Sequence, residues 1–460
     1  MSRLHDLRTA WRVLRAEGLR AVADRAADRL AESRRARSFT PAPPGWRPAV
    51  PVPVLRLLAT PPAPRLGGVQ AQLLARLTAE ARLGPVALLY PAGSAWRLEV
   101  EAGGERRAVT FPAGTPSSAG LEIAFEDGAF EAAVRGAAAL TGARALHAEG
   151  LAGLPFTSLR RLRGPDLRLI VSLHDFAAFC PRPHLLEHPC LRFCDYSRDL
   201  DRCGRCLGQS WPLLPDRPAF QAARREVAAA LLAEADAVVF ASDFLLRAHR
   251  DLFPDLAVER SWVIAPAAGG RRGAVPEGPP RPPGPLRHVA YAGSVQSHKG
   301  AEVFVEVVER LAGEAGEALR WSVYGGGDAD LLARLRKLPG VRVRGYHRIG
   351  SLSGRLVRDR VDLALVLSIW PEAYNLVLSE CRLARVPVLA FDHGAVADRI
   401  RAEGGGLLVP PEAGAEGIAG ALRTMLRAGK APEVPADAAA RIPDAEAAAR
   451  AVRELYGSLV

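Results

Sequence analysis

The stretch Ser368-Ile-Trp-Pro-Glu372-Ala-Tyr-Asn375-Leu-Val-Leu-Ser-Glu380 decides how we interpret this chain. The apolar run 363–367 before it predicts a strand, and the pattern over 376–384 predicts a helix. Glu372 therefore falls in the loop, and Glu380 falls about one turn into the helix. A helix that begins at Leu376 offers free N–H groups and a partial positive charge at its start, which favour a bound phosphate.

The polar side chains of this stretch add to the prediction of a binding site. Glu380 can accept both hydroxyls of a cis-diol such as ribose. Asn375 is the only Asn in the chain. It lies where the chain enters the helix, and Asn tolerates a left-handed backbone better than most residues. The alternative is that both glutamates are solvated acids that favour the positive end of the helix dipole.

A second motif is Ala292-Gly293-Ser294-Val-Gln-Ser-His298-Lys299-Gly300, which follows a predicted strand and opens a predicted helix. Gly293 permits a close approach of the backbone, and Lys299 offers a point charge to a diphosphate. Lys299 is also one of only three lysines in the chain. A glycine turn with one lysine is weak evidence alone, but the glutamate motif downstream strengthens it.

The rest of the chain predicts two α/β domains joined by a linker. Alternating strand and helix patterns of the doubly wound type occur on both sides of a Gly/Pro/Arg-rich stretch. Two such domains leave a cleft between the carboxyl ends of two sheets, where open α/β proteins bind ligands. The predicted parts are a basic amphipathic helix (1–40), a first domain (50–266), a linker (267–285), a second domain (286–440) and a C-terminal helix packing back on the first domain (441–460).

The formal net charge is +11, and residues 1–40 hold ten Arg against five acids. In this segment Leu19, Val22, Ala26 and Leu30 continue a stripe that begins with Leu4, Leu7, Trp11 and Leu14. Such a helix either lies on an anionic membrane or packs against the protein, and periodicity does not separate the two. No interleaved aromatic and basic residues suggest nucleic-acid binding. No apolar run reaches the ~18 residues of a membrane span, and no secretory signal is present, so we expect a cytoplasmic protein.

Five of the six cysteines lie between residues 180 and 206. The spacing of Cys190, Cys194, Cys203 and Cys206 is that of a four-thiolate zinc site, and a reducing cytoplasm argues against disulfides. The segment fits either a structural zinc knuckle on the acceptor side or unligated thiols in a loop. Two Asp-x-Asp triplets begin at Asp199 and Asp328. The first lies in the cysteine cluster and the second opens a helix, so neither is a strong candidate for a metal site.

At these motifs the chain resembles the retaining GT-B glycosyltransferases of family 4, also called glycosyl transferases group 1. The resemblance rests on Gly293-Ser294 with Lys299-Gly300 and on Glu372 with Glu380, and it extends over about 120 residues. It continues through Asp392-His-Gly394 and Gly405-Gly406-Leu-Leu-Val-Pro410. The family often has Arg where this chain has Ser294, and a second Gly where it has Ala395.

The first domain resembles the family less closely, at Gly67-Gly68 and at His174-Asp175-Phe176. The resemblance implies a GT-B fold, that is, two doubly wound parallel-sheet domains facing across a cleft. It implies that Gly68 approaches the donor phosphates and that His174 hydrogen-bonds the donor sugar or the reacting centre. A lone His is otherwise more often structural. Some relatives carry a cysteine-containing insertion like residues 180–206, which implies a structural role for it.

The implied activity is transfer of a sugar from a nucleotide-sugar donor with retention of configuration. Lys299 would hold the diphosphate, Glu380 the ribose and Glu372 the transferred sugar, and the chemistry needs no metal or other cofactor. The acceptor would be a glycan or lipid-linked molecule, in polysaccharide biosynthesis on the inner face of the membrane. A non-catalytic sugar-nucleotide-binding partner subunit remains the alternative, and Ser294 in place of Arg keeps it open.

Overall fold

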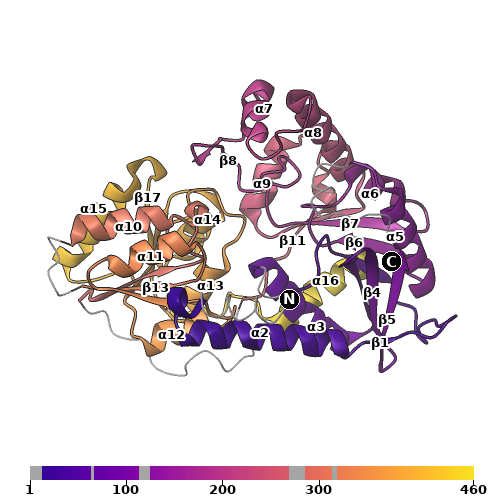
Figure 1. The fold of residues 1–460 in the computed structure, drawn as a ribbon, viewed down its shortest axis with the longest axis horizontal. Coiled ribbons are helices and arrows are strands. Elements are labelled where there is room, and N and C mark those ends of the chain that lie inside the picture. Colours follow the sequence, from indigo (N-terminus) through magenta and orange to yellow (C-terminus); the bar gives the residue numbers. More distant parts are fainter. Residues whose placement is uncertain (1–12, 64–66, 113–124, 269–284, 313–318, 460) are drawn as a thin grey trace. The chain divides into compact units, whose positions relative to one another are not determined.

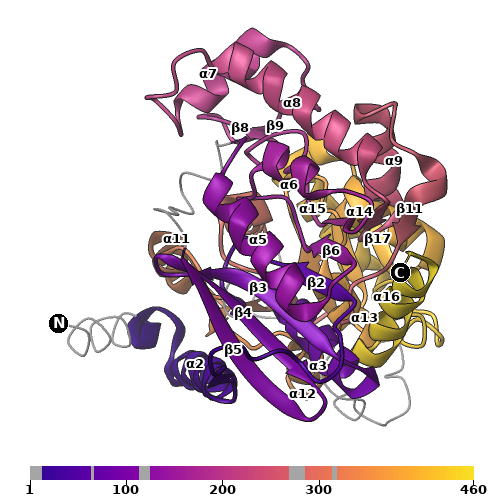
Figure 2. The ribbon, with the colours of Figure 1, turned by 90° about the vertical axis from the view of Figure 1, so that its right-hand side faces the viewer.

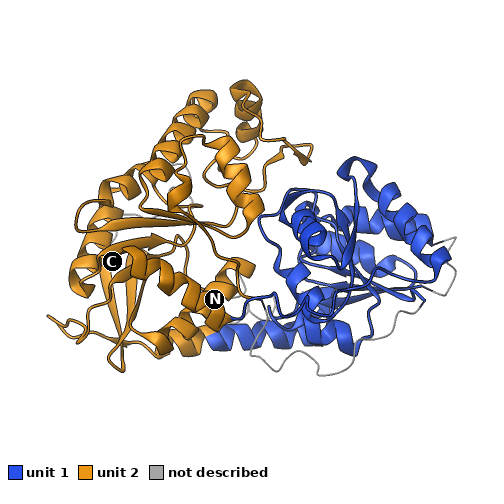
Figure 3. Cartoon of the chain, turned by 180° about the vertical axis from the view of Figure 1, so that it is seen from behind, with its two compact units in different colours: residues 1–31, 268–444 blue, residues 32–267, 445–460 orange. Residues whose placement is uncertain are grey.

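The computed structural model describes residues 13–63, 67–112, 125–268, 285–312 and 319–459. The chain divides into two compact units, shown in two colours in Figure 3. Unit 1 takes residues 1–31 and 268–444, and unit 2 takes residues 32–267 and 445–460. The division falls inside helix α2 (Leu19–Arg37), so the N-terminal segment belongs in part to unit 1 and not to a separate domain.

Unit 1 is built on a six-stranded sheet whose paired strands are all parallel, in the order β14-β13-β12-β15-β16-β17. The order reverses between β12 and β15, and ligands of open α/β sheets bind outside the carboxyl ends of strands at such a point. The strands are β12 (His288–Ala292), β13 (Arg320–Tyr324), β14 (Val341–Gly345), β15 (Leu363–Val366), β16 (Val388–Phe391) and β17 (Gly406–Val409).

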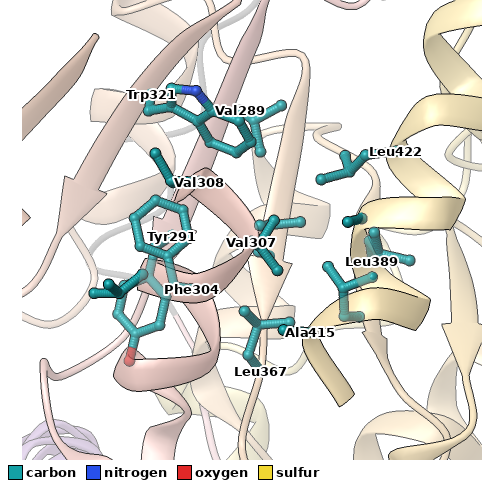
Figure 4. Packing of buried hydrophobic residues seen from close by; sticks show 14 of the residues in the cluster. Val289, Tyr291, Phe304, Val307, Val308, Trp321, Leu367, Leu389, Ala415 and Leu422 are labelled. Carbon is teal, nitrogen blue, oxygen red and sulfur yellow. The ribbon is translucent and has the colours of Figure 1, made fainter. Parts of the chain in front are cut away.

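Helices connect these strands, as Figure 1 shows. On α10 the apolar residues recur at three- and four-residue spacing and bury Phe304, Val307 and Val308 against the sheet. Figure 4 shows Phe304 beside Tyr291 and Trp321 in this core. The helices are α10 (Ala301–Leu311), α11 (Ala329–Lys337), α12 (Leu352–Arg358), α13 (Leu376–Leu383), α14 (Gly394–Glu403) and α15 (Gly414–Ala428), with short 3₁₀ turns at Ser297–Lys299 and Pro411–Ala413.

Unit 2 has a nine-stranded sheet in the order β1-β5-β4-β3-β2-β6-β7-β10-β11. Its strands β3, β4 and β5 pair antiparallel, and its other paired strands are parallel. Figure 2 shows them as long neighbouring strands. The strands are β1 (Thr40–Pro41), β2 (Val54–Leu57), β3 (Val86–Ala92), β4 (Ala95–Ala102), β5 (Glu105–Pro112), β6 (Ala145–Ala148), β7 (Arg168–Leu173), β10 (Ala237–Phe240) and β11 (Ser261–Val263).

The helices of unit 2 include the C-terminal helix α16, which packs on α3. No helix among the described residues is long and apolar enough to cross a membrane. The helices are α3 (Gly68–Leu83), α5 (Gly128–Thr141), α6 (Phe156–Leu162), α7 (Leu200–Gly208), α8 (Arg217–Glu234), α9 (Asp243–Leu252) and α16 (Ala445–Leu459), with a 3₁₀ turn at Val258–Arg260 and a small hairpin of β8 (Leu186–Glu187) and β9 (Arg192–Phe193).

The N-terminal helix packs differently from the predicted stripe. Residues 13–17 are helical, the helix is interrupted at Gly18, which has φ 90°, and α2 follows. Leu19 and Leu30 are 78% and 58% exposed, whereas the acids Glu17 and Asp28 are buried. Within unit 1, polar contacts of Glu17, Asp24 and Asp28 hold this segment. Leu4, Leu7 and Trp11 lie outside the described residues.

Candidate functional site

The loop after β12 is shaped by a glycine that approaches the neighbouring strand closely. Gly300 has φ 73°, and a Cβ there would lie 1.9 Å from the carbonyl oxygen of Leu367 at the end of β15. Only glycine fits this contact. The hydroxyl of Tyr291 donates to the carbonyls of Ser294 and Lys299 at 2.8 and 3.0 Å. The two motifs found in the sequence are thereby brought together at the point where the strand order reverses.

The centre of this site is an ion pair between Lys299 and Glu372. Lys299 Nζ lies 2.9 Å from Glu372 Oε2, and the lysine side chain is 24% exposed against 8% for the glutamate. Glu372 Oε1 accepts hydrogen bonds from the Ser368 hydroxyl and, at 3.0 Å, from Asn375 Nδ2. Burial alone would raise the pKa of Glu372, but Lys299 and these donors lower it below its ordinary value. Glu372 is therefore an anion held in place by three neighbours.

Asn375 adopts the positive φ that its side chain predicted, at 72°. Its Oδ1 accepts the N–H of Leu378 at 2.7 Å and so caps helix α13, which begins at Leu376. The same amide thus accepts a hydrogen bond from the first turn of the helix with its oxygen and donates one to Glu372 with its nitrogen. This double use accounts for an asparagine at this position.

His393 belongs to the same cluster and was not predicted as a site residue. It follows β16, and its Nε2 lies 2.8 Å from the carbonyl oxygen of Ser368. Burial lowers the pKa of His393, which favours the neutral ring. Its position directly after a strand of the parallel sheet is the signal that would have identified it.

Glu380 is placed away from Glu372, against the N-terminus of α12. Its Oε1 accepts the N–H of Gly350 at 3.1 Å, and its Oε2 accepts those of Leu352 and Ser353 at 2.7 and 3.2 Å. Burial raises the pKa of Glu380 although all three bonds lower it. A carboxylate has about four acceptor positions, so one remains open on Oε1. Glu380 therefore caps the N-terminus of α12, in addition to any contact it makes with a ligand. The sequence did not indicate this capping role.

Unit 2 holds the other predicted residues, Gly68 and His174. Gly68 is the first residue of α3. His174 follows β7 and lines a small cavity together with Gln72, Arg76 and Ser172. Burial lowers the pKa of His174 to about 4, with Glu149 opposing and Arg76 assisting the shift. Its Nε2 is buried and has no hydrogen-bond partner within the part of the chain that the structure describes.

A network of buried charges lies next to His174. Arg56 and Arg76 pair with Glu80 and Glu149, and all four side chains are at most 5% exposed. Burial alone would raise the pKa of Glu149, but the two arginines and His147 lower it to about 2. The sequence did not indicate this network, because its members come from two separate elements, β2 and α3, and from the start of the loop after β6.

The network extends to the C-terminal helix through His147. His147 Nδ1 lies 2.6 Å from the hydroxyl of Tyr456 on α16, and its Nε2 lies 2.7 Å from the Ser172 hydroxyl. Burial lowers the pKa of His147 to about 3. The helix α16 is thus tied to the sheet of unit 2 by a buried polar contact as well as by packing.

The predicted zinc ligands are not brought together as a set. Cys194, Cys203 and Cys206 line one cavity with Cys180, whereas Cys190 is exposed and donates to the carbonyl of Glu187. Across the described ranges, no three His, Cys, Asp or Glu side chains are arranged to hold a metal ion. The set Cys190, Cys194, Cys203 and Cys206 stays a prediction, and in this structure Cys190 does not line the cavity that the other three share.

Comparison with known proteins places this site in context. Residues 287–428, which contain all the unit 1 site residues, match the family Glycosyl transferases group 1. No curated protein matches the sequence. The fold is that of the GT-B proteins. The structure of sucrose-phosphate synthase from Thermosynechococcus elongatus is 18% identical, with a TM-score of 0.59, and the match covers 89% of this chain and 99% of that one.

Two further solved structures show the same fold. Anabaena Alr3699/HepE in complex with UDP-glucose is 15% identical at a TM-score of 0.56, with 88% of this chain and 100% of that chain covered. WaaG, a glycosyltransferase involved in lipopolysaccharide biosynthesis, is 14% identical at a TM-score of 0.52, with 88% and 95% covered. The domain match and the fold together support a glycosyltransferase of the GT-B type.

Proposed function

We propose that this chain transfers a sugar from a nucleotide-sugar donor to a glycan or lipid-linked acceptor, with retention of configuration. The observation that carries the proposal is the Lys299–Glu372 pair beside the start of α13. A partly exposed cation and a fixed anion at the carboxyl ends of parallel strands suit a ligand that has both phosphates and hydroxyls.

Each residue of unit 1 has a distinct part in this proposal. Lys299 and the free N–H groups at Leu376 stabilise the charge that develops on the departing diphosphate, in the manner of electrostatic catalysis. Gly293 and Ser294 let the backbone approach the phosphates. Glu372 accepts hydrogen bonds from hydroxyls of the transferred sugar. For Lys299 to engage phosphate, its ammonium turns from Glu372 toward the ligand, which its exposure permits.

Glu380 is the proposed contact to the ribose. Because three of its acceptor positions are taken by backbone N–H groups, it takes one ribose hydroxyl and not both. In unit 2, Gly68 approaches the donor phosphates, and the neutral His174 offers its unpartnered Nε2 to the donor sugar. The chemistry needs no metal, because the cations and helix end already supply positive charge.

The exposed side of α2 supports the proposal that the acceptor is lipid-linked. Leu19 and Leu30 are exposed there among arginines, in a pattern that suits the surface of an anionic membrane, where a lipid-linked acceptor would lie. Sedimentation with vesicles of neutral and of anionic lipid tests this part. The Leu19→Ser/Leu30→Ser variant should lose binding to the anionic vesicles, and equal binding by this variant would remove the membrane from the proposal.

Release of nucleoside diphosphate from UDP, GDP and ADP sugars tests the activity, with and without EDTA and candidate acceptors. Uridine donors come first because the similar Alr3699/HepE structure contains UDP-glucose. We expect release that EDTA does not abolish and that Glu372→Gln lowers about a hundredfold, with NMR of the product showing retention. Glu306→Gln is the control, since Glu306 pairs only with the nearby Arg310 on the surface of α10.

The alternative of a non-catalytic partner subunit makes a different prediction. Ser294 stands where the resembled family often has Arg, so one phosphate contact is weaker here. A subunit of that kind binds the nucleotide sugar but releases no nucleoside diphosphate with any acceptor. Binding without turnover across the panel would favour this alternative over the enzyme.

A further inference from the structure

The N-terminal segment of unit 1 carries two buried carboxylates that point at one loop. Glu17 and Asp28 are 5% and 3% exposed. Burying an acid is costly unless it is paired and hydrogen-bonded. Arg25 on the same helix supplies one partner, at 2.6 Å from Glu17 Oε1. The remaining partners come from the loop 346–351 between β14 and α12.

This loop is held by both acids at its first residues. Glu17 Oε2 accepts the backbone N–H of Tyr346 at 2.9 Å, and Asp28 Oδ2 accepts the Tyr346 hydroxyl at 2.7 Å. Asp28 Oδ1 accepts Arg348 Nε at 2.8 Å. The guanidinium of Arg25 lies over the Tyr346 ring at 4.5 Å. An ion pair between Asp24 and Arg355 also joins α2 to α12.

The ends of strands β13 and β14 carry glycines where the N-terminal segment approaches closely. Gly345, at the end of β14, has φ 71°, and a Cβ there would lie 2.4 Å from the carbonyl oxygen of Glu17. A Cβ on Gly326, just after β13, would lie 2.2 Å from Glu17 Oε2. A side chain at Gly345 would displace the backbone at Glu17, and one at Gly326 would displace the side-chain ends of Glu17 and Arg25. The N-terminal segment is therefore an integral part of the carboxyl edge of this sheet, the edge at which such folds bind ligands.

The far end of the same loop is held by Glu380, through the N–H groups of Gly350, Leu352 and Ser353. Between the two ends lies His347, whose Nδ1 is buried and has no hydrogen-bond partner within the described ranges. A loop held by carboxylates at both ends keeps Glu380 in one orientation. The same loop carries the unpartnered ring nitrogen of His347, a group of the kind that can recognise a nucleoside.

We propose that Glu17 and Asp28 are positioning residues of the donor site, which hold the loop 346–351 and through it the nucleoside contact of Glu380. The inference rests on the proposed function. It gives the N-terminal helix a specific task in nucleotide binding, although more than 300 residues separate it from the loop. Neither acid touches the donor. Each acts on the backbone and side chain of Tyr346.

The test is calorimetric binding of UDP, GDP and ADP and of their sugars to the full chain and its variants. Glu17→Ala and Asp28→Asn should weaken the nucleoside diphosphate that the wild type prefers by about tenfold, and Glu17→Gln, which keeps an acceptor oxygen, should retain more affinity. Affinity for inorganic pyrophosphate should stay unchanged, because Lys299 and α13 are not altered. Ala23→Ser, at an exposed position of α2, is the matched control and should leave nucleotide affinity unchanged.

A double-mutant cycle separates positioning from a general loss of stability. If Glu17 acts through the loop, Glu17→Ala should cost much less in a Glu380→Ala background than in the wild type. Additive losses, equal losses for pyrophosphate and nucleotides, or unchanged nucleotide affinity would each overturn the proposal. Tighter nucleotide binding by Glu17→Ala would also overturn it, since the helix would then obstruct the site. If the wild type binds no nucleotide, the proposed function itself has failed.

Discussion

Both units contain a buried glutamate held by cations, but the two arrangements serve different ends. In unit 1, Glu372 faces a lysine that is 24% exposed. In unit 2, Glu149 is paired with Arg56 and Arg76, whose side chains are at most 5% exposed and are also bound to Glu80. A cationic side chain with access to solvent can turn from its carboxylate partner to contact a ligand. A cationic side chain enclosed among carboxylates cannot do this. We therefore expect substitutions at the Lys299–Glu372 pair to affect mainly activity and substitutions in the Glu149 network to affect mainly stability.

The largest effect we expect is on stability in unit 2. Glu149→Ala leaves the buried Arg56 and Arg76 sharing Glu80, so one buried positive charge loses its carboxylate, and breaking a buried pair costs about 3–5 kcal/mol. Urea denaturation followed by circular dichroism measures this cost. Glu446→Ala is the control, because its pair with Arg82 is about half exposed and is worth under about 1 kcal/mol. Similar midpoints for the two variants would mean that the network is not structural.

The corresponding change in unit 1 should affect activity more than stability. Lys299→Ala removes the cation proposed for the diphosphate and should lower the turnover rate about 10²- to 10³-fold. Its urea midpoint should fall less than that of Glu149→Ala, because Lys299 is partly solvated and Glu372 keeps its hydrogen bonds from Ser368 and Asn375. Lys337→Ala, on the exposed end of α11, should change neither quantity. A large stability loss in Lys299→Ala with normal turnover by the remaining folded protein would reverse the comparison.

A smaller effect concerns how the folding stability of unit 2 depends on pH. His147 is buried and its pKa is lowered to about 3, whereas in the unfolded chain it titrates near about 6.5. A lowered pKa in the folded state means that the stability is present above about pH 6.5 and is lost as the pH falls toward 3. The slope from this one group approaches about 1.4 kcal/mol per pH unit.

The Tyr456→Phe variant provides the matched comparison for this pH effect. It removes the hydroxyl beside His147 Nδ1 but keeps the ring in its apolar cluster with Val54 and Ala145, so its midpoint should fall while the pH slope stays. His147→Asn should instead reduce the slope between about pH 6 and 4. An unchanged slope in His147→Asn would show that other groups, such as His174, carry the acid sensitivity.

The sequence predicted unit 1 well because its signals are local. Ten of the elements from β12 to α15 follow from apolar runs and glycine turns, and Lys299, Glu372 and Asn375 come together as the motif spacing indicated. Helix α14 and strand β17 were quoted only as motif residues. The contacts that tie Glu380 to Gly350 and Leu352 could not be predicted, since spacing does not show which loop meets a helix.

Unit 2 was predicted less well for reasons that are visible in its residues. The hairpin of β4 and β5 turns at Gly103-Gly104, a two-residue signal that was present but not used, and Trp96, Leu98 and Val100 alternate inward as a strand requires. The buried charge network joins residues 56 and 456, and no local pattern relates them. Most of the predicted linker at 267–285 lies outside the described residues.

The central claim is that the donor site lies in unit 1 and depends on Lys299. Calorimetric titration of UDP, GDP and ADP sugars into the wild type, Lys299→Ala and Glu380→Ala tests it most directly. The account predicts that one nucleotide class binds and that each substitution weakens it at least about tenfold, or 1.4 kcal/mol. Equal binding by the wild type and Lys299→Ala would contradict the account.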